Sequence, residues 1–228
     1  MPLETAENVS QIYRTRFEET GIAKRDRVWK TLCKSYFDHH MVSSGSILDL
    51  ACGYGEFVNN IDVKTKFAVD LNPDAKSHLN GGVNFKATRA DNLSHIPSNT
   101  LDRAFTSNFL EHLPDKKACD AVLKEVLRVL KPGGRFIILG PNIKYAYKEY
   151  WDFYDHYLEL SHISLAEGLR MNGYEITSNV PRFLPFTMAN KQPTHDLFIR
   201  AYLAMPLFWK VFGKQFLVTA EKPKNAIG

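Results

Sequence analysis

The sequence predicts an α/β fold built on a mostly parallel, doubly wound β-sheet. From Ser46 onward, short apolar runs with strand character alternate with helix-like segments, a pattern typical of a parallel sheet covered on both faces. The first apolar run leads into a loop that carries two glycines, Gly53 and Gly55. A strongly apolar run at 135–140 follows a sharp helix stop rich in proline and glycine. Together these three observations predict the α/β class.

The chain before Ser46 is predicted to be helical from about residue 6 to residue 40, within an N-terminal unit that spans 1–42. Gly21 is expected to divide this stretch into two helices. The exposed faces of the helices are expected to be basic. The apolar and aromatic positions that indicate helix are Ile12, Tyr13, Phe17, Val28, Trp29, Leu32 and Phe37.

The core of the fold is predicted to span 46–180 and 214–221 of a single domain. Its first five strands are expected near 46–50, 66–70, 83–87, 102–107 and 135–140, and its helices near 55–61, 73–79, 116–130 and 165–172. Residues 131–134 are expected to form a turn, and Gly173 is expected to end the last helix. The last two strands are expected near 174–179 and 215–220.

Residues 181–213 form an insertion between the last two predicted strands, and this insertion is unusually rich in proline and aromatic residues. Such a segment is expected to be a lid, a dimer contact or a membrane contact. Within 197–212, apolar residues near Trp209 are flanked by basic residues, so both a homodimer and peripheral membrane contact are open partners for this stretch. A lid or a dimer contact is favoured over the membrane.

Composition limits the classes of function. The chain has 228 residues and a formal net charge of +4, which favours one globular domain and does not by itself favour a nucleic-acid partner. The three cysteines are too few and too widely spaced for a disulfide framework or a zinc site, and we expect a reducing cytoplasm. No signal peptide is expected at 1–10, and no apolar run reaches the ~20 residues that span a bilayer. No metal site is predicted.

Acidic residues follow the first two predicted strands, next to the glycine loop. Asp49 closes the first run and Asp70 closes the second. Glycines let the backbone approach a ligand closely, and an acid at the end of the neighbouring strand can accept hydrogen bonds from a ribose diol. The third glycine of a dinucleotide site is absent, and Glu56 would repel a pyrophosphate. The pattern therefore favours a nucleoside ligand without phosphate.

Three segments together resemble the signature of class I S-adenosylmethionine-dependent methyltransferases: 47–55, 69–73 and 127–135. The resemblance runs from about Ser46 to Pro141. It implies a Rossmann-like sheet of seven strands with an antiparallel hairpin at one edge, and S-adenosylmethionine as the cofactor. The chain departs from the family at Ala51, where glycine is usual, and we expect this alanine to be tolerated.

The resemblance also implies roles for individual residues at the donor. Gly53 and Gly55 would pass under the methionine portion, Asp49 would orient its ammonium group, and Asp70 would bind the ribose. Asp49 and Asp70 could instead serve only as helix caps, with Asn72 an equally good cap. The full set expected to bind the donor is Asp49, Ala51, Gly53, Gly55, Asp70, Leu71, Asp91, Asn92, Asn108 and Arg16.

Within that set, Asp91 would accept a hydrogen bond from the adenine amino group, and its alternative is an Asx-turn. Asn92 would cover the adenine ring. Asn108 would lie near the sulfur. Arg16 could pair with the donor carboxylate, although an arginine on a helix face is commonly just solvated.

The acceptor side is expected to contain the catalytic residues His156 and His112. An acceptor hydroxyl must lose its proton as its oxygen attacks, and a histidine titrates near neutral pH. His156 is the first candidate for the general base, oriented by Asp155 or Asp152. His112 and His162 are its reserves, and each histidine could instead belong to a structural polar network. Trp151 and Tyr154 could stack on the acceptor or belong to the core.

These residues predict a methyltransferase acting on a small molecule or a glycan, at a hydroxyl group. Two alternatives stay open: a donor-binding partner protein without turnover, and a nucleic-acid methyltransferase. The segment after the fourth strand lacks the motif of enzymes that methylate adenine or glutamine amino groups, and Cys119 lies within a helix, unlike the nucleophile of cytosine C5 enzymes.

Overall fold

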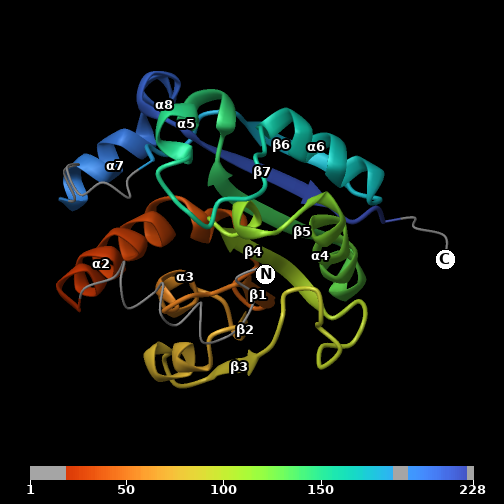
Figure 1. Cartoon of the computed structure of the whole chain (residues 1–228). Helices are drawn as coiled ribbons and strands as arrows, with labels where there is room; N and C mark the ends of the chain where they lie inside the picture. Colours follow the sequence, from red (N-terminus) through yellow and green to blue (C-terminus); the bar gives the residue numbers. More distant parts are fainter. Residues whose placement is uncertain (1–18, 187–194, 225–228) are drawn as a thin grey trace.

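The computed structural model describes residues 19–186 and 195–224, and its centre is a seven-stranded sheet (Figure 1). The strand order is β3-β2-β1-β4-β5-β7-β6, and every neighbouring pair is parallel except the two pairs that involve β7. The predicted α/β class and the antiparallel hairpin at the edge are therefore confirmed. The strands are β1 (Ser46–Leu50), β2 (Thr65–Asp70), β3 (Val83–Ala87), β4 (Leu101–Ser107), β5 (Leu130–Pro141), β6 (Glu175–Val180) and β7 (Gln215–Glu221).

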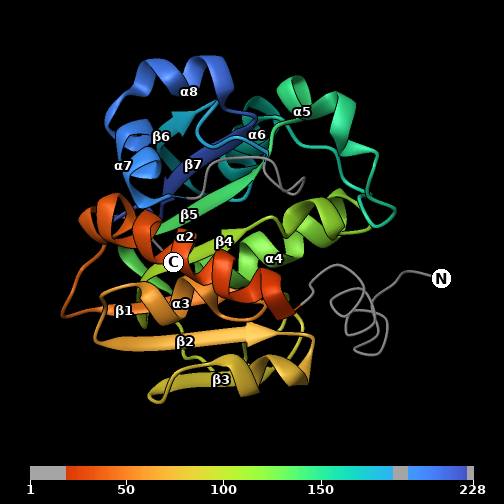
Figure 2. The ribbon, with the colours of Figure 1, turned by 90° about the vertical axis from the view of Figure 1, so that its left-hand side faces the viewer.

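Helices cover both faces of the sheet. They are α2 (Glu19–Ser35), α3 (Glu56–Asn60), α4 (Lys116–Val129), α5 (Ile143–Tyr150), α6 (His162–Met171), α7 (Asp196–Ala204) and α8 (Pro206–Phe212), with 3₁₀ turns η1 (Phe37–His40), η2 (Pro73–His78) and η3 (Leu110–His112). Leu48 and Ile138 pack in one core cluster with residues of α4 and α6. Their neighbours Ile47 and Ile137 pack in a second cluster with α2, α3 and α7, which Figure 2 shows on the other face of the sheet. Adjacent residues of a strand point to opposite faces, so this alternation fills both layers.

The described part of α2 begins at Glu19 and includes Gly21, so the division expected at this residue is wrong, and residues 6–18 of the expected helical stretch lie outside the described residues. A glycine inside a helix costs only about 1 kcal/mol relative to alanine. The buried face of α2, which includes Leu32 and Cys33, packs in the same cluster as Phe57 and Phe105 and outweighs that cost. Position 21 therefore lies inside a helix held by its packing.

Two other predicted segments differ in detail. Residues 73–78 form a 3₁₀ turn, where an α-helix was expected. The strand β5 starts at Leu130, which pairs with Leu101, whereas the next pair is Arg103 with Arg135. The expected turn at 131–134 is thus looped out of the ladder inside β5.

The segment between β6 and β7 contains α7 and α8, and Phe183 and Leu203 bury in the cluster shared with α2. Arg182 fixes this segment, because its guanidinium donates to the carbonyls of Gly213 and Val211 at 2.7 and 2.6 Å. None of the helices in the described part of the chain has the length and apolar character needed to cross a bilayer.

Candidate donor and acceptor site

The loop between β1 and α3 has a left-handed backbone at three positions. Ala51, Gly53 and Gly55 have φ of 57°, 56° and 78°. The φ of Gly55 favours glycine, and a Cβ there would lie 2.3 Å from Cδ2 of Leu79, so the Leu79 side chain would also have to move. Ala51 has the same left-handed backbone with a side chain, a conformation that costs roughly 1–2 kcal/mol. The alanine therefore carries a conformational cost at this position, and its expected tolerance for donor binding stays a prediction.

Asp70 connects the end of β2 to this loop. Its Oδ2 accepts from the backbone N–H of Gly53 at 2.8 Å, and its Oδ1 accepts from that of Asn72 at 2.8 Å. The side chain that caps η2 is Asn72, which accepts from the N–H of Asp74 at 3.0 Å. Burial raises the pKa of the Asp70 carboxyl, although both backbone hydrogen bonds oppose the shift. Asp70 thus holds the loop in shape, and its contact with a ribose stays a prediction.

Asp49 is buried at the end of β1, where 3% of its surface is exposed. Its Oδ2 accepts from the N–H of Val58 in α3 at 3.3 Å, and burial raises its pKa well above the usual range. The helix-capping interaction expected as an alternative is present. An ammonium group beside this carboxyl would favour its ionised form, so the two roles are compatible.

The residues after β3 are engaged locally. Both carboxylate oxygens of Asp91 pair with the guanidinium of Arg89 at 3.0 Å, and this hydrogen bonding lowers the pKa of Asp91. Asn92 accepts from the hydroxyl of Ser94 at 2.9 Å, as in an Asx-turn. Leu71 lies between Asp70 and Asn72, directly after β2. An adenine contact by Asp91 or Asn92 stays a prediction, and Arg16 lies outside the described residues.

Asn108 follows β4 directly, at the carboxyl end of that strand. Its φ is 48°, and its N–H donates to the carbonyl of Leu139 at 3.0 Å. Its side-chain Oδ1 is buried, and no other group among the described residues gives it a hydrogen bond. A buried acceptor without a donor is costly, so a ligand that donates at this point would stabilise the site. With the glycine loop at the end of the adjacent β1, these residues fit the predicted donor.

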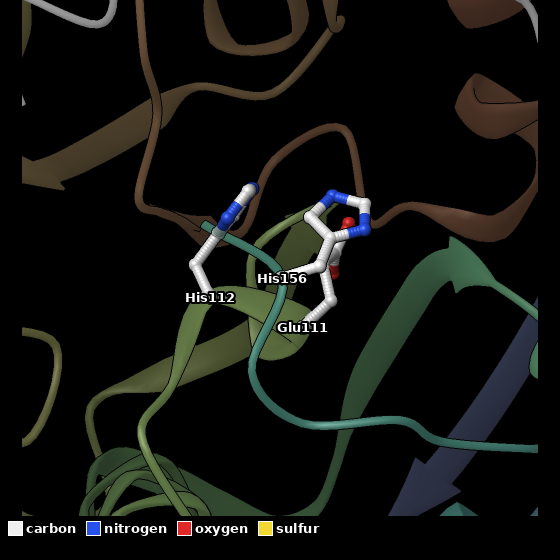
Figure 3. Close-up of side chains that lie close together, drawn as sticks. All are labelled: Glu111, His112 and His156. Carbon is white, nitrogen blue, oxygen red and sulfur yellow. The ribbon is translucent and has the colours of Figure 1, made fainter. Parts of the chain in front are cut away.

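Next along the chain, Glu111, His112 and His156 come together (Figure 3). One oxygen or nitrogen atom of each side chain lies within 4.8 Å of the others. The backbone explains the approach, because the N–H groups of Tyr157 and Leu158 both donate to the carbonyl of Glu111, at 2.8 and 3.1 Å. These bonds hold the segment after α5 against η3, at the carboxyl end of β4. Both histidines were predicted as candidates, but no sequence pattern indicates that they meet Glu111.

The immediate surroundings of His156 are aromatic. Its ring stacks on Phe153 with centroids 4.9 Å apart, and it lies 4.6 Å from the ring of Tyr150 and 5.0 Å from that of His112. Only 7% of His156 is exposed. Phe153 in turn contacts Phe186, so the start of the segment between β6 and β7 reaches this cluster. The predicted base is therefore enclosed.

Asp155 pairs with His112, and its expected role in orienting His156 stays a prediction. The Nδ1 of His112 lies 2.9 Å from the carbonyl of Asp155 and 3.2 Å from its carboxylate. Burial by itself would lower the pKa of His112, but the bond to Asp155 and the charge of Glu111 raise it. Asp152, the other orienting candidate, is exposed.

Glu111 was expected, with His112, to line the transfer site, and the structure adds the environment of its carboxyl. It is 4% exposed, and it lines a small cavity with apolar residues, among them Leu110, Ile138 and Leu158. Burial raises the pKa of its carboxyl to about 7. A carboxyl and two imidazoles in this enclosed place can exchange protons or bind a cation.

The remaining acceptor candidates lie outside the cluster of Glu111, His112 and His156. Trp151 and Tyr154 are 59% and 89% exposed, so neither belongs to the core. His162 begins α6, where its Nδ1 lies 2.9 Å from the Nδ2 of Asn142. Asn142 also donates to the carbonyl of Pro181 at 2.8 Å, so His162 belongs to a network that joins β5 to the segment after β6.

The pair α7 and α8 has one packed side and one apolar exposed side. Ile199 and Trp209 pack in the cluster with α2. The large apolar residues that stay exposed are Leu197, Phe198, Leu207, Phe208, Val211 and Phe212. Exposed apolar residues are typical of a contact surface. The expected lid, dimer contact or membrane contact stays a prediction.

Comparison with known proteins gives a consistent result. Residues 48–138 match a family model described as a methyltransferase domain. A curated relative named methyltransferase, from Claviceps purpurea (strain 20.1), is 26% identical over 141 residues, which cover 53% of this chain and 43% of the relative. The match thus spans less than half of the relative's length.

Solved structures share the fold over most of this chain. A SAM-dependent methyltransferase from Archaeoglobus fulgidus superposes with a TM-score of 0.65 at 20% identity, over 87% of this chain and 94% of that one. A Haloferax volcanii chain, solved in a complex with the Trm112 methyltransferase activator, gives 0.63 at 19% identity over 88% and 92%. At these identities the likeness shows the fold alone.

Proposed function

Since this chain belongs to the class I S-adenosylmethionine-dependent methyltransferases, we propose that it transfers a methyl group from S-adenosylmethionine to a hydroxyl of a small molecule or a glycan. The observation that carries the choice of a hydroxyl is the pair of imidazoles, His112 and His156, with ring centroids 5.0 Å apart beyond the carboxyl end of β4. Oxygen methylation needs a base at this edge, next to the donor loop that follows β1.

The reaction is an in-line displacement at the methyl carbon. The acceptor oxygen forms the new carbon–oxygen bond while the carbon–sulfur bond breaks, and the sulfur keeps the electron pair. The donor is already activated, so the chain's own task is to orient both reactants and exclude water. His156 takes the proton that the hydroxyl loses, and its burial among Phe153 and Tyr150 supports a water-poor site.

The donor is held by the residues around β1, β2 and β4. The backbone of Gly53 and Gly55 lies under its methionine portion, Asp70 accepts from the ribose, and Asn108 supplies an oxygen that has no donor of its own among the described residues. We place the protein in a reducing compartment, since Cys33, Cys52 and Cys119 are all buried and unpaired.

The test separates binding from turnover. Calorimetry with S-adenosylmethionine comes first, followed by incubation of the chain with methyl-labelled donor and fractionated cell extract. We expect donor binding and label in a small-molecule or glycan fraction that is stable to base, as an ether is. Donor binding without label in any fraction would instead support a non-catalytic binding protein, and label in RNA or DNA would support the nucleic-acid alternative.

A further inference from the structure

The cluster of Glu111, His112 and His156 combines three side chains that are common ligands of transition metals. They come from two separate parts of the chain, the turn η3 and the segment after α5. Their approach is fixed by backbone hydrogen bonds from Tyr157 and Leu158 to the carbonyl of Glu111. The side chains therefore meet on a rigid support, which favours a defined site.

The spacing suits a single ion. The potential ligand atoms lie within 4.8 Å of one another. Around a tetrahedral zinc ion with bonds of about 2.1 Å, ligand atoms are about 3.4 Å apart. Closing the cluster requires shifts of at most about 1.4 Å between ligand atoms, which side-chain rotations can supply. Figure 3 shows the carboxyl of Glu111 beside the ring of His156, with His112 on the neighbouring side.

The second layer of contacts also matches a metal site. Histidine ligands almost always donate their other ring N–H to a carboxylate or a carbonyl, which fixes the tautomer. His112 has both kinds of partner at Nδ1, the carbonyl of Asp155 at 2.9 Å and its carboxylate at 3.2 Å. A proton on Nδ1 leaves Nε2 available to bind a cation.

We propose that Glu111, His112 and His156 bind a divalent transition-metal ion, with zinc as the best fit. Two imidazoles disfavour magnesium and calcium, which prefer oxygen ligands, and favour zinc, iron or nickel. Three protein ligands leave a coordination position open for water or an acceptor oxygen. A cation there would acidify a bound hydroxyl and would replace His156 as the group that favours loss of its proton, because His156 would then be a ligand. Metal binding is measured apart from methyl transfer, so the two proposals can fail independently.

The test measures metal binding directly. The full chain without a histidine tag is stripped with a chelator and titrated with zinc by calorimetry, and bound zinc is counted by mass spectrometry. We expect one equivalent per chain. Glu111→Gln and His156→Ala should each weaken binding by at least about 100-fold. Asp155→Asn removes only the second-layer carboxylate and should weaken it by about 10–100-fold.

The matched control is His39→Ala. His39 is exposed in η1. This turn precedes β1 and so lies on the side of the amino ends of the parallel strands, opposite to the proposed metal site. The His39→Ala variant should bind zinc with the same affinity as the unchanged chain. No zinc bound by the unchanged chain, or equal binding in the Glu111, His156 and Asp155 variants, would overturn the proposal. Because Glu111→Gln alters a buried group, the circular dichroism spectrum of each variant must match that of the unchanged chain. If Glu111→Gln does not fold, the zinc affinity of Asp155→Asn tests the proposal in its place.

Discussion

Replacing Asp70 with alanine tests the donor site most directly, because this carboxylate has a structural role and a predicted binding role. In the structure it accepts two backbone hydrogen bonds, from Gly53 and Asn72, both at 2.8 Å. Alanine removes both acceptors and leaves two N–H groups without their partner. The loop under the predicted donor then loses its attachment to β2.

The size of the effect follows from these contacts. Hydrogen bonds to a charged group contribute about 1.5–3 kcal/mol each, so the two bonds contribute about 3–6 kcal/mol. Burial raises the pKa of Asp70 and so opposes its ionised form, which offsets part of that contribution. We therefore expect Asp70→Ala to lower the free energy of unfolding by about 2–4 kcal/mol, and Tm by roughly 4–16 °C.

Donor affinity should fall separately from stability. Loss of hydrogen bonds from the ribose to a carboxylate should raise the Kd for S-adenosylmethionine by about 10- to 100-fold. The assays are urea denaturation and calorimetry with donor, both at a temperature where every variant is folded. Asp70→Asn, which keeps an acceptor oxygen, should lose less stability than Asp70→Ala.

The matched control is Asp102→Ala. Asp102 accepts from the backbone N–H and the hydroxyl of Ser46, both at 2.9 Å, and pairs with Lys131 at 2.8 Å. These contacts lie at the amino ends of β1 and β4, at the edge of the sheet away from the donor loop. The control should lose stability and keep its donor affinity. If Asp70→Ala loses stability but binds donor as before, Asp70 only shapes the loop; if it loses no stability, our account of the loop is wrong.

Three further predictions concern single features. Ala51→Gly should raise the free energy of unfolding by about 0.5–1 kcal/mol, because it relieves the φ of 57° at a small entropic cost, and a lower denaturation midpoint would contradict the strain. His156→Ala should abolish methyl transfer and leave donor affinity within about twofold of the unchanged chain; full turnover would return the role of base to His112 or to water. Leu207→Glu, at a position 70% exposed in α8, should shift a reversible dimer to monomer in sedimentation equilibrium. An unchanged chain that is monomeric at every concentration, yet sediments with anionic vesicles, would favour the membrane contact.

The positions of the strands and the glycine loop could be predicted from the sequence because their signals are local. An apolar run followed by an aspartate and two glycines specifies a strand and a left-handed loop within ten residues, whatever surrounds them. The structure confirms strands at 46–50 and 83–87 with the predicted bounds. Where packing competes with local preference the prediction failed, as at Gly21, which lies inside a helix held by its buried face.

At the donor, the sequence could list acidic side chains but could not assign their partners. Two candidate caps two residues apart gave equal local signals, and the fold gave capping to Asn72 and loop attachment to Asp70. The adenine contact expected of Asp91 stays a prediction, whereas its pairing with Arg89, a residue only two positions away, is a contact that no sequence pattern specified. Such choices depend on side-chain geometry within a few ångströms.

By itself the sequence determined the α/β sheet, and it predicted a resemblance to methyltransferases and a place for the donor, since each rests on short contiguous motifs. What only the tertiary structure decided is the environment of Glu111. The backbone N–H groups of Tyr157 and Leu158 donate to its carbonyl and so bring His156 beside it across more than forty positions of the chain. Burial next to an apolar cavity raises the pKa of its carboxyl to about 7. Burial and long-range hydrogen bonding set both properties, and neither has a local signal in the order of the residues.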